Sequence, residues 1–522
     1  MLHPIDHHWR LALATGLLAL AACGGGGGGE SPDPSPDYPA AEGTIDQAYS
    51  DATSYSVQPG GSLAQANEGT AVSRHRITAG GAALNYTARA GHLVVNDAGG
   101  SPLASFFYVA YSLDGGNPAQ RPVTFFYNGG PGSASVWLHL GSFGPKRLAT
   151  GVPSTSAATP YPLVDNEQTL LTTSDLVFVD AIGTGLSQAV APRTNQDFWG
   201  VDVDADAFRD FIRRYVAVSG RTAAPKFLFG ESYGTTRSAV LAERLESAGV
   251  RLAGVVLQSS VLDYNSNCGV VSAASCAGYL PSYAATGAYH RLVSPAPADV
   301  GTYMQQMRAF SLDSYSPALQ AYLARPSPPP AALVGELADR TGLAAAQWQT
   351  RFNMDPTTFQ YALLPADLIG RYDGRVAAPR GSPLTSEGDP SSTMLSSSFS
   401  AAIRGYLRNS LGFTSITGYT SLSNAIATWN FAHDGRALPD TVPDLATAMA
   451  LNPRLRVLSV NGYHDLATPF FQTELDLDRL GADAPVLVRS YAGGHMTYLD
   501  DDSRPRLLAD LRAFYQQAIE AR

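Results

Sequence analysis

The centre of the sequence reads Lys226-Phe227-Leu228-Phe229-Gly230-Glu231-Ser232-Tyr233-Gly234. Its apolar run, Phe227 to Phe229, is typical of a strand buried on both faces, and a helical pattern follows from Thr236 to Leu245. Between them stands a G-x-S-x-G pattern, in which a strand turns sharply into a helix and holds the serine strained with its hydroxyl exposed. A chain with 50 glycines can match this pattern by chance, so its weight rests on the strand before it and the helix after it.

Strand and helix patterns alternate on both sides of this stretch. Short apolar runs at 176–179, 254–257, 456–460 and 486–488 predict buried strands, and helices are predicted at 202–218 and 504–519. Such alternation predicts a mostly parallel central sheet with helices on both faces. Segments 83–95, 102–113 and 123–127 have period-two patterns, which predict antiparallel strands at the edge of the sheet. Residues from about 40 to 71 are small and polar, and we expect an irregular lead-in there.

The alternation stops between residues 264 and 444. This stretch contains a proline-rich segment at 326–330, helical patterns near 317–324 and 333–352, and a serine-rich segment at 391–400 that predicts loops. We predict an inserted cap region over the sheet, because the strand pattern resumes at Arg456; a separate domain is the alternative. The core is then divided into residues 46–263 and 445–522.

Two further residues complete a catalytic pattern with Ser232. Asp465 follows the predicted strand that ends at Val460, and His495 follows the predicted strand 486–488. The order Ser, Asp, His, each beyond the carboxyl end of a strand, is that of the α/β-hydrolase fold, in which these loops converge. His495 is predicted to take the proton of Ser232, and Asp465 to hold the histidine tautomer and stabilise its cation.

The segment Asn128-Gly129-Gly130-Pro131-Gly132 follows the predicted strand 123–127. Its glycines allow backbone N–H groups to approach a developing oxyanion. We predict an oxyanion hole formed by the N–H groups of Gly130 and Tyr233, the residue after the nucleophile. Losing one such donor typically costs about 3–4 kcal/mol of transition-state stabilisation.

These motifs together resemble the serine carboxypeptidases, α/β-hydrolase peptidases that remove C-terminal residues. The matching stretches are Asn128 to Gly132, Gly230 to Gly234, Gly494-His495-Met496 and Val179 to Ser187. The resemblance implies hydrolysis of C-terminal peptide bonds through an acyl-enzyme, with peptides as substrates and without a cofactor.

The resemblance also implies a site for the substrate's terminal carboxylate. Asn128 would donate to it, and Glu231, if protonated, would share a hydrogen bond with it, so binding should favour acidic pH. The alternative for Glu231 is a structural role beside the serine. Many family members carry a second glutamate where this chain has Ser142, and a cysteine where it has Ser133. The partner carboxyl and one disulfide are therefore missing.

Other functions fit parts of the pattern. An esterase or an acyltransferase would keep the triad, and a non-catalytic exported binding lipoprotein would keep only the fold. Asn128 and Glu231 favour the carboxypeptidase, because an ester substrate offers no terminal carboxylate. We expect a structural or surface role for His464, and no cluster of residues has metal-ligand spacing.

The N-terminal residues predict export. Arg10 precedes an apolar stretch too short to span a bilayer, and Leu20-Ala21-Ala22-Cys23 resembles the bacterial lipobox, whose cysteine is lipidated. We predict a lipoprotein signal peptide at 1–23, a flexible linker at 24–45 and a lipid anchor on Cys23 at the periplasmic or outer-membrane face of the envelope. The alternative is an ordinary signal cut after Ala21, which would give a secreted protein.

The net charge and the cysteine positions bear on possible partners and on disulfide formation. The net charge is -10 and no run of Lys and Arg occurs, which excludes nucleic acid as an expected partner. Cys268 and Cys276 are close in sequence, and in an exported protein we favour a local disulfide over two free thiols. Nothing in the sequence indicates an oligomeric state.

Overall fold

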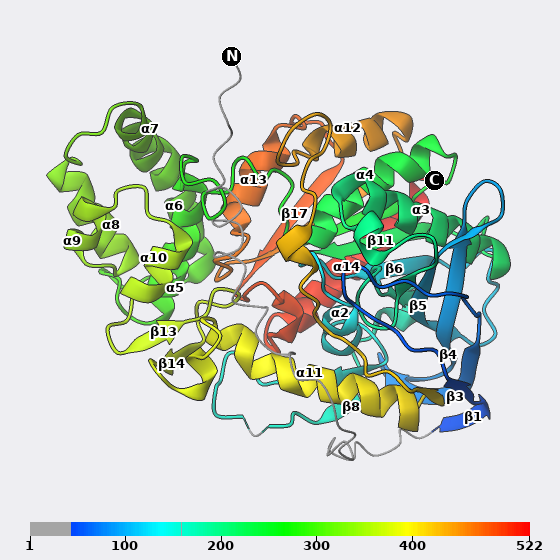
Figure 1. Ribbon diagram of the computed structural model, residues 1–522. Coiled ribbons are helices and arrows are strands. Elements are labelled where there is room, and N and C mark those ends of the chain that lie inside the picture. The colour runs from blue at the N-terminus through cyan, green and yellow to red at the C-terminus, as the bar shows by residue number, and fades with distance from the viewer. Residues whose placement is uncertain (1–42, 158) are drawn as a thin grey trace.

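The computed structural model describes residues 43–157 and 159–522 (Figure 1). The predicted signal peptide and Cys23 lie outside the described residues, as does nearly all of the predicted linker. In the described part, no helix combines the length and apolar character needed to cross a membrane.

An 11-stranded sheet forms the centre of the molecule. Its parallel part consists, in spatial order, of β9 (Asp175–Val179), β6 (Val123–Tyr127), β11 (Lys226–Glu231), β12 (Gly254–Gln258), β16 (Arg456–Gly462) and β17 (Val486–Tyr491). Beyond β9 the sheet continues antiparallel through β5 (Pro102–Leu113), β4 (Ala82–Asn96), β3 (Thr70–Ala79) and β1 (Gly43–Gln47), with β10 (Gln188–Ala189) paired to β5.

Helices cover both faces of the parallel strands. One face packs against α3 (Val201–Val218), α4 (Tyr233–Ser247) and α12 (Val442–Leu451), and the other against α2 (Val136–Gly141), α11 (Pro390–Asn409) and α14 (Arg504–Glu520). Successive strand residues alternate between the two faces, so that Phe125 packs on the first and Phe126 on the second. Because both faces are covered, the central strands are mainly apolar, and the arrangement confirms the predicted mostly parallel sheet with helices on both faces.

Two predictions about the first part of the chain were wrong. β6 is a central parallel strand between β9 and β11, not an antiparallel edge strand. The expected irregular lead-in contains β1 and β2 (Tyr49–Asp51), and β1 pairs with β3, a strand that begins inside it. Local periodicity reports how buried a strand is, whereas its neighbours in the sheet depend on tertiary packing.

The serine-rich segment 391–400 is not a set of loops but the first half of α11. Asp389 caps this helix by accepting a hydrogen bond from the Ser391 N–H, and Pro390 occupies its first turn. Met394, Leu395 and Phe399 lie on its buried side. The apolar spacing and the cap therefore outweigh the low helix propensity of the serines.

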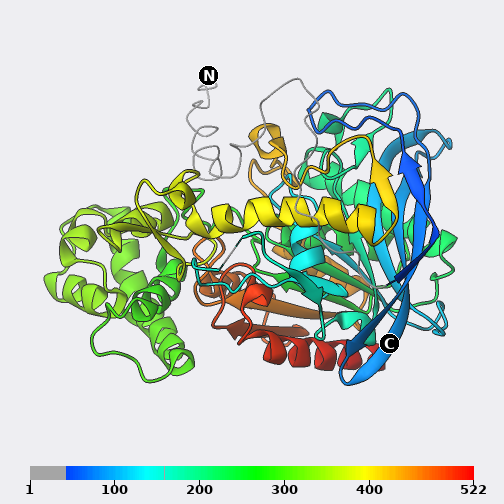
Figure 2. The same ribbon diagram turned by 90° about the horizontal axis from the view of Figure 1, so that it is seen from below.

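The chain between β12 and β16 adds no strand to the large sheet. Its first part forms a lobe of α5 (Leu280–Tyr289), α6 (Val300–Phe310), α7 (Ser316–Ala324), α8 (Ala331–Thr341), α9 (Ala345–Thr350) and α10 (Pro356–Ala362), with a short hairpin of β13 (Asp367–Ile369) and β14 (Ala377–Pro379). The lobe has its own apolar core and lies beside the sheet, and α11 runs from it across the molecule (Figures 1 and 2). Cys268 and Cys276 are joined by a disulfide at its start.

The last part of this segment returns to the core. β15 (Phe413–Ser415) pairs with β2, and the predicted boundary at residue 444 falls inside α12, which packs on α4. The remaining elements are the small pair β7 (Lys146–Leu148) and β8 (Leu163–Asp165), and α13 (Phe470–Asp478) between β16 and β17.

Candidate active site

Ser232 lies at the sharp turn between β11 and α4. Its φ of 59° is in the left-handed region, which is strained for a residue with a side chain. The turn is held by the hydrogen bond from the Ser232 N–H to Gln258 O, 3.0 Å long. A Cβ on Gly230 would stand 2.2 Å from Gly234 O, and one on Gly129 would stand 2.4 Å from the Tyr233 nitrogen. Glycine is therefore required at position 230 within the turn and at position 129 in the loop that packs against it.

Asp465 and His495 come together from neighbouring loops. The Asp465 loop follows β16, the His495 loop follows β17, and Asp465 Oδ2 lies 2.7 Å from His495 Nδ1. Asp465 also accepts hydrogen bonds from the N–H and hydroxyl groups of Thr468, at 3.0 and 2.8 Å. Both members of the pair are buried. These contacts fix the carboxylate, which in turn fixes the imidazole ring.

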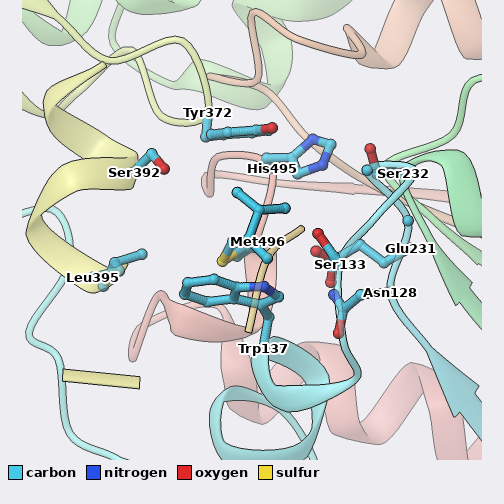
Figure 3. A pocket seen from close by; sticks show the side chains of 13 residues that line it. Asn128, Ser133, Trp137, Glu231, Ser232, Tyr372, Ser392, Leu395, His495 and Met496 are labelled. Carbon is cyan, nitrogen blue, oxygen red and sulfur yellow. The ribbon is translucent and has the colours of Figure 1, made fainter. Parts of the chain in front are cut away.

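The surroundings of His495 favour its cation. Burial lowers the pKa of His495, but the charge and hydrogen bond of Asp465, assisted by Glu231, outweigh burial and raise the pKa above its ordinary value. Figure 3 shows the imidazole between Tyr372 and Ser232. A histidine so placed can take a proton from the serine hydroxyl and remain stabilised while it carries the charge.

Most of the predicted catalytic and carboxylate-binding residues line one pocket, although Asp465 and Tyr233 are not part of its lining. Its lining combines residues of the sheet core with residues of the segment 264–444, and they are Asn128, Gly129, Gly130, Ser133, Trp137, Glu231, Ser232, Tyr372, Ser392, Leu395, Leu422, His495 and Met496. Trp137 and Met496 lie between Leu395 on one side of the pocket and Asn128 and Glu231 on the other (Figure 3). Polar groups beside Ser232 thus adjoin an apolar wall.

The backbone expected to form the oxyanion hole is next to the serine. Gly130 lines the pocket with a φ of 101°, and Tyr233 is the first residue of α4, where an N–H has no partner within the helix. Arg237 holds this region in place: its guanidinium donates to Asn128 O at 2.7 Å and to Asp204 at 2.6 Å. Gly130 thus lines the pocket, and Gly129 packs against the Tyr233 nitrogen. The oxyanion hole formed by the N–H groups of Gly130 and Tyr233 stays a prediction.

Glu231 is buried beside Asn128 at the pocket. Burial raises the pKa of the Glu231 carboxyl to about 7, against the opposing effects of His495, Tyr498 and Asn128. Tyr498 donates its hydroxyl to Glu231 Oε2 at 2.6 Å. The Asn128 amide oxygen accepts from the Leu138 N–H at 3.1 Å, which orients the amide nitrogen away from α2. A carboxyl with this pKa is mostly protonated below neutral pH and can then donate a hydrogen bond.

Other residues singled out in the sequence lie elsewhere. Ser142 is buried at the end of α2 and donates to Leu138 O at 2.5 Å, so it does not line the pocket. His464 is buried against the ring of Tyr289, and burial lowers its pKa well below the ordinary value. Within residues 43–157 and 159–522, no group of His, Cys, Asp or Glu side chains is arranged to hold a metal ion.

Sequence reasoning missed the contribution of the segment 371–375 from the inserted region. The His495 N–H donates to Tyr372 O at 2.6 Å, the Leu466 N–H to Arg371 O at 3.0 Å, and the Gly374 N–H to His464 O at 2.9 Å. The Tyr372 ring lies over His495 with ring centroids 4.7 Å apart. This segment therefore holds the loops of Asp465 and His495, although no motif marks it.

Arg375 also attaches the inserted region to the loop of His495. Its guanidinium is buried and pairs with Asp373 at 2.7 Å and with Asp500 at 2.6 Å, and it also donates to Ala492 O at 2.6 Å. Ala492 and Asp500 flank the His495 loop. Arg375 thus links the inserted region to the loop that carries the histidine.

The chain is similar to known serine carboxypeptidases in part of its sequence and in its fold. Residues 80–283 match the model of the serine carboxypeptidase family, a range that includes Asn128, Glu231 and Ser232 but ends before Asp465 and His495. Among solved structures, the chain is similar to Kex1(Δ)p, a prohormone-processing carboxypeptidase from Saccharomyces cerevisiae, with 15% identity and a TM-score of 0.50, over 82% of this chain and 91% of that one. This chain has the α/β-hydrolase fold.

Two further structural matches are more distant. Proline iminopeptidase from Mycobacterium smegmatis has 15% identity and a TM-score of 0.35, over 82% of this chain and 99% of that chain. Epoxide hydrolase from Aspergillus niger has 15% identity and a TM-score of 0.35, over 82% and 79% respectively. No curated protein matches the sequence.

Proposed function

We propose that the protein is a serine carboxypeptidase that hydrolyses C-terminal peptide bonds through an acyl-enzyme. The observation that supports it most is the presence, in one pocket, of Ser232 beside His495 and of a buried Glu231 beside Asn128. The first pair suits acyl transfer, and the second suits recognition of a terminal carboxylate. The family match over residues 80–283 supports the same function.

In the proposed mechanism Ser232 Oγ attacks the carbonyl carbon of the last peptide bond while His495 Nε2 takes the hydroxyl proton. The N–H groups of Gly130 and Tyr233 stabilise the oxyanion. His495 then gives the proton to the leaving nitrogen, and the C-terminal amino acid departs. Water attacks the ester with His495 again as base, which releases the shortened peptide and restores Ser232. Asp465 keeps the His495 Nδ1 proton in place throughout.

Carboxylate recognition makes substrate binding dependent on pH. Glu231 must be protonated to donate to a substrate carboxylate, because two facing carboxylates repel each other. Since burial raises its pKa to about 7, the donor is present below that pH and is lost above it. His495 must be neutral to act as base, so kcat/KM should fall at acidic pH as well. The two limbs of the profile belong to the Glu231–His495 pair, because their charges interact.

An esterase or acyltransferase activity of the same triad is the second candidate. The buried Glu231 argues against a simple esterase, because an uncharged ester has nothing for a carboxyl donor and Asn128 to recognise. An acyltransferase would share the acyl-enzyme and differ in using an alcohol instead of water. A binding protein without activity would not need the Asp465–His495 contact at 2.7 Å.

The test is the release of the C-terminal residue from a blocked dipeptide between pH 4 and 8. Wild type should act on the free acid and not on the C-terminal amide, and Ser232→Ala should abolish release. Equal turnover of the amide, or turnover of simple esters alone, would favour the esterase. Absence of any Ser232-dependent turnover would favour a binding protein.

We also propose that the protein is exported and lipid-anchored through Cys23. The lipobox-like sequence before a glycine-rich linker supports this location. Membrane fractionation of cells that express wild type or Cys23→Ser tests it. The wild type should be found in the envelope fraction and should be released from it by detergent. An equal distribution of wild type and Cys23→Ser between the fractions would contradict the anchor.

A further inference from the structure

Tyr498 contacts the proposed carboxylate site from behind the pocket. It belongs to a short 3₁₀ helix, Thr497–Leu499, directly after the His495 loop, and its side chain is fully buried. It is not among the residues that line the pocket. Its hydroxyl donates to Glu231 Oε2 at 2.6 Å, which is a short hydrogen bond. Tyr498 therefore reaches the substrate site through Glu231, and it also interacts with the Asn128 side chain.

The position of this phenol is rigidly held. The Arg504 guanidinium donates to the backbone carbonyls of Tyr498 and Gly141, and Thr497 donates to Gln258 at 3.1 Å. A Cβ on Gly141 would stand 2.9 Å from the Tyr498 ring, so the ring packs directly on α2. The phenol cannot turn to another partner without disturbing these contacts.

Tyr498 is a donor at every pH at which the enzyme would work. Burial, together with the neighbouring Glu231 charge, raises the pKa of the phenol well above its ordinary value, so the hydroxyl keeps its proton. A protonated carboxyl has one O–H donor, and its other oxygen serves as the acceptor. Since the carbonyl oxygen is the stronger acceptor, the hydrogen bond from Tyr498 to Oε2 favours the tautomer that carries the proton on Oε1.

We propose that Tyr498 is a positioning residue for substrate recognition: by donating to Oε2 it places the Glu231 proton on Oε1, the oxygen available to the terminal carboxylate of a peptide. This inference rests on the proposed function. It assigns to a phenol the role of directing a single carboxyl group, Glu231, which supplies the protonated donor for carboxylate binding.

Several titratable or polar groups face Glu231, and the test must separate their effects from that of Glu231. His495 and Asp465 face it from the loops after β17 and β16, Asn128 from the loop after β6, and Tyr372 from the inserted region. His495 titrates in the same pH range, so its contribution must be measured separately. Glu231→Gln provides that control, because it removes the titration of Glu231 and leaves that of His495.

The experiment measures the Kd of a blocked dipeptide acid and its amide for Ser232→Ala between pH 5 and 9. In this parent the acid should bind more tightly than the amide below about pH 7 and lose affinity above it. Adding Tyr498→Phe removes a hydrogen bond to the charged carboxylate, which should move the loss of affinity upward by about one pH unit. Tyr515→Phe is the matched control, since it removes another buried phenol that is hydrogen-bonded to Thr124.

Glu231→Gln tests the orientation directly. Its amide oxygen should accept from Tyr498 and its NH₂ should point to the pocket, so acid binding should persist to high pH apart from the part due to His495. Adding Tyr498→Phe to this variant should weaken acid binding by about three- to tenfold, because the amide is no longer oriented. Amide-substrate binding should not change. This comparison of Glu231→Gln with and without Tyr498→Phe does not depend on any shift of a titration curve.

The outcomes separate the two claims. If Ser232→Ala binds acid and amide equally at every pH, the carboxylate site itself is wrong, and the role of Tyr498 is wrong with it. If the parent prefers the acid but Tyr498→Phe gives the same pH profile as Tyr515→Phe, only the role of Tyr498 is overturned. A thermal unfolding curve for each variant shows whether it is folded. If Tyr498→Phe does not fold, the Glu231→Gln variant alone decides: loss of its acid binding would overturn the inference.

Discussion

The two sides of the active-site pocket come from regions with different kinds of sequence. The core side carries Ser232, Asp465 and His495, each in a loop at the carboxyl end of a parallel strand. The opposite side carries Tyr372 and Leu395 from the inserted region, where no strand joins the large sheet. The topology of the sheet is enough to bring the first set together, whereas the second set depends on how a helical lobe and α11 pack on the core.

This difference suggests a division of labour. The core side holds the groups that form and break bonds, and the inserted side contacts their outer faces and completes the pocket wall. Changes in the core should therefore act on the chemical step, and changes in the inserted region on stability, on the shape of the pocket and on the placement of His495. The following variants test that division, from the largest expected effect to the smallest.

Ser232→Ala should have the largest effect, because it removes the nucleophile. We expect kcat to fall by about 10⁴-fold or more, with unchanged thermal unfolding. Ser247→Ala, at the exposed end of the same helix α4, should keep wild-type activity. Residual activity within tenfold of wild type would show that the chemistry takes place elsewhere.

Arg375→Met should break the attachment of the inserted region to the His495 loop. It leaves Asp373 and Asp500 buried without their partner, and we expect the free energy of unfolding to fall by about 3–5 kcal/mol. Arg351→Met removes an exposed pair with Asp355 and should cost less than about 0.5 kcal/mol. Denaturant unfolding measures both. Equal effects of the two variants would mean that the buried attachment adds nothing.

Leu395→Ala should change which substrates fit, because Leu395 forms part of the apolar wall of the pocket. We expect the ratio of kcat/KM for a bulky over a small C-terminal side chain to rise about tenfold. The preference for free acid over amide should stay, since Glu231 and Asn128 are untouched. Leu407→Ala, buried further along α11, controls for loss of stability alone. An unchanged ratio would remove the inserted region from substrate selection.

Tyr372→Ala should have the smallest effect. It removes the ring that packs on His495 at 4.7 Å, while the backbone contact at Tyr372 O remains. We expect kcat to fall about three- to tenfold, and Tyr372→Phe to keep wild-type kcat because the ring is retained. Steady-state kinetics on the dipeptide acid measures both. A loss in the phenylalanine variant as large as in the alanine variant would mean that the hydroxyl, not the ring, is important.

Much of the core side could be predicted because its signals are local. The turn at Ser232 needs a buried strand, two glycines and a helix within one short stretch. The loops of Asp465 and His495 each follow an apolar strand, and the convergence of such loops is a property of parallel sheets. No comparison tests the roles of these residues, and those roles stay predictions that the geometry supports.

The errors and omissions concern features that local sequence does not carry. The pattern of β6 shows burial but not its neighbours, so its central position was missed. The serines of α11 lower its helix propensity, so the apolar spacing of its buried face was not recognised in the sequence. Tyr372 and Tyr498 have no motif, because their importance comes from partners far away in sequence, His495 and Glu231 respectively.

The central claim, Ser232-dependent removal of C-terminal residues, is tested most directly by mass spectrometry of a peptide of known sequence incubated with the enzyme at pH 6. We predict loss of single residues from the C-terminus, one after another, with the same peptide intact when its C-terminus is amidated or when Ser232→Ala is used. Internal cleavage, or equal shortening of the amidated peptide, would contradict the account.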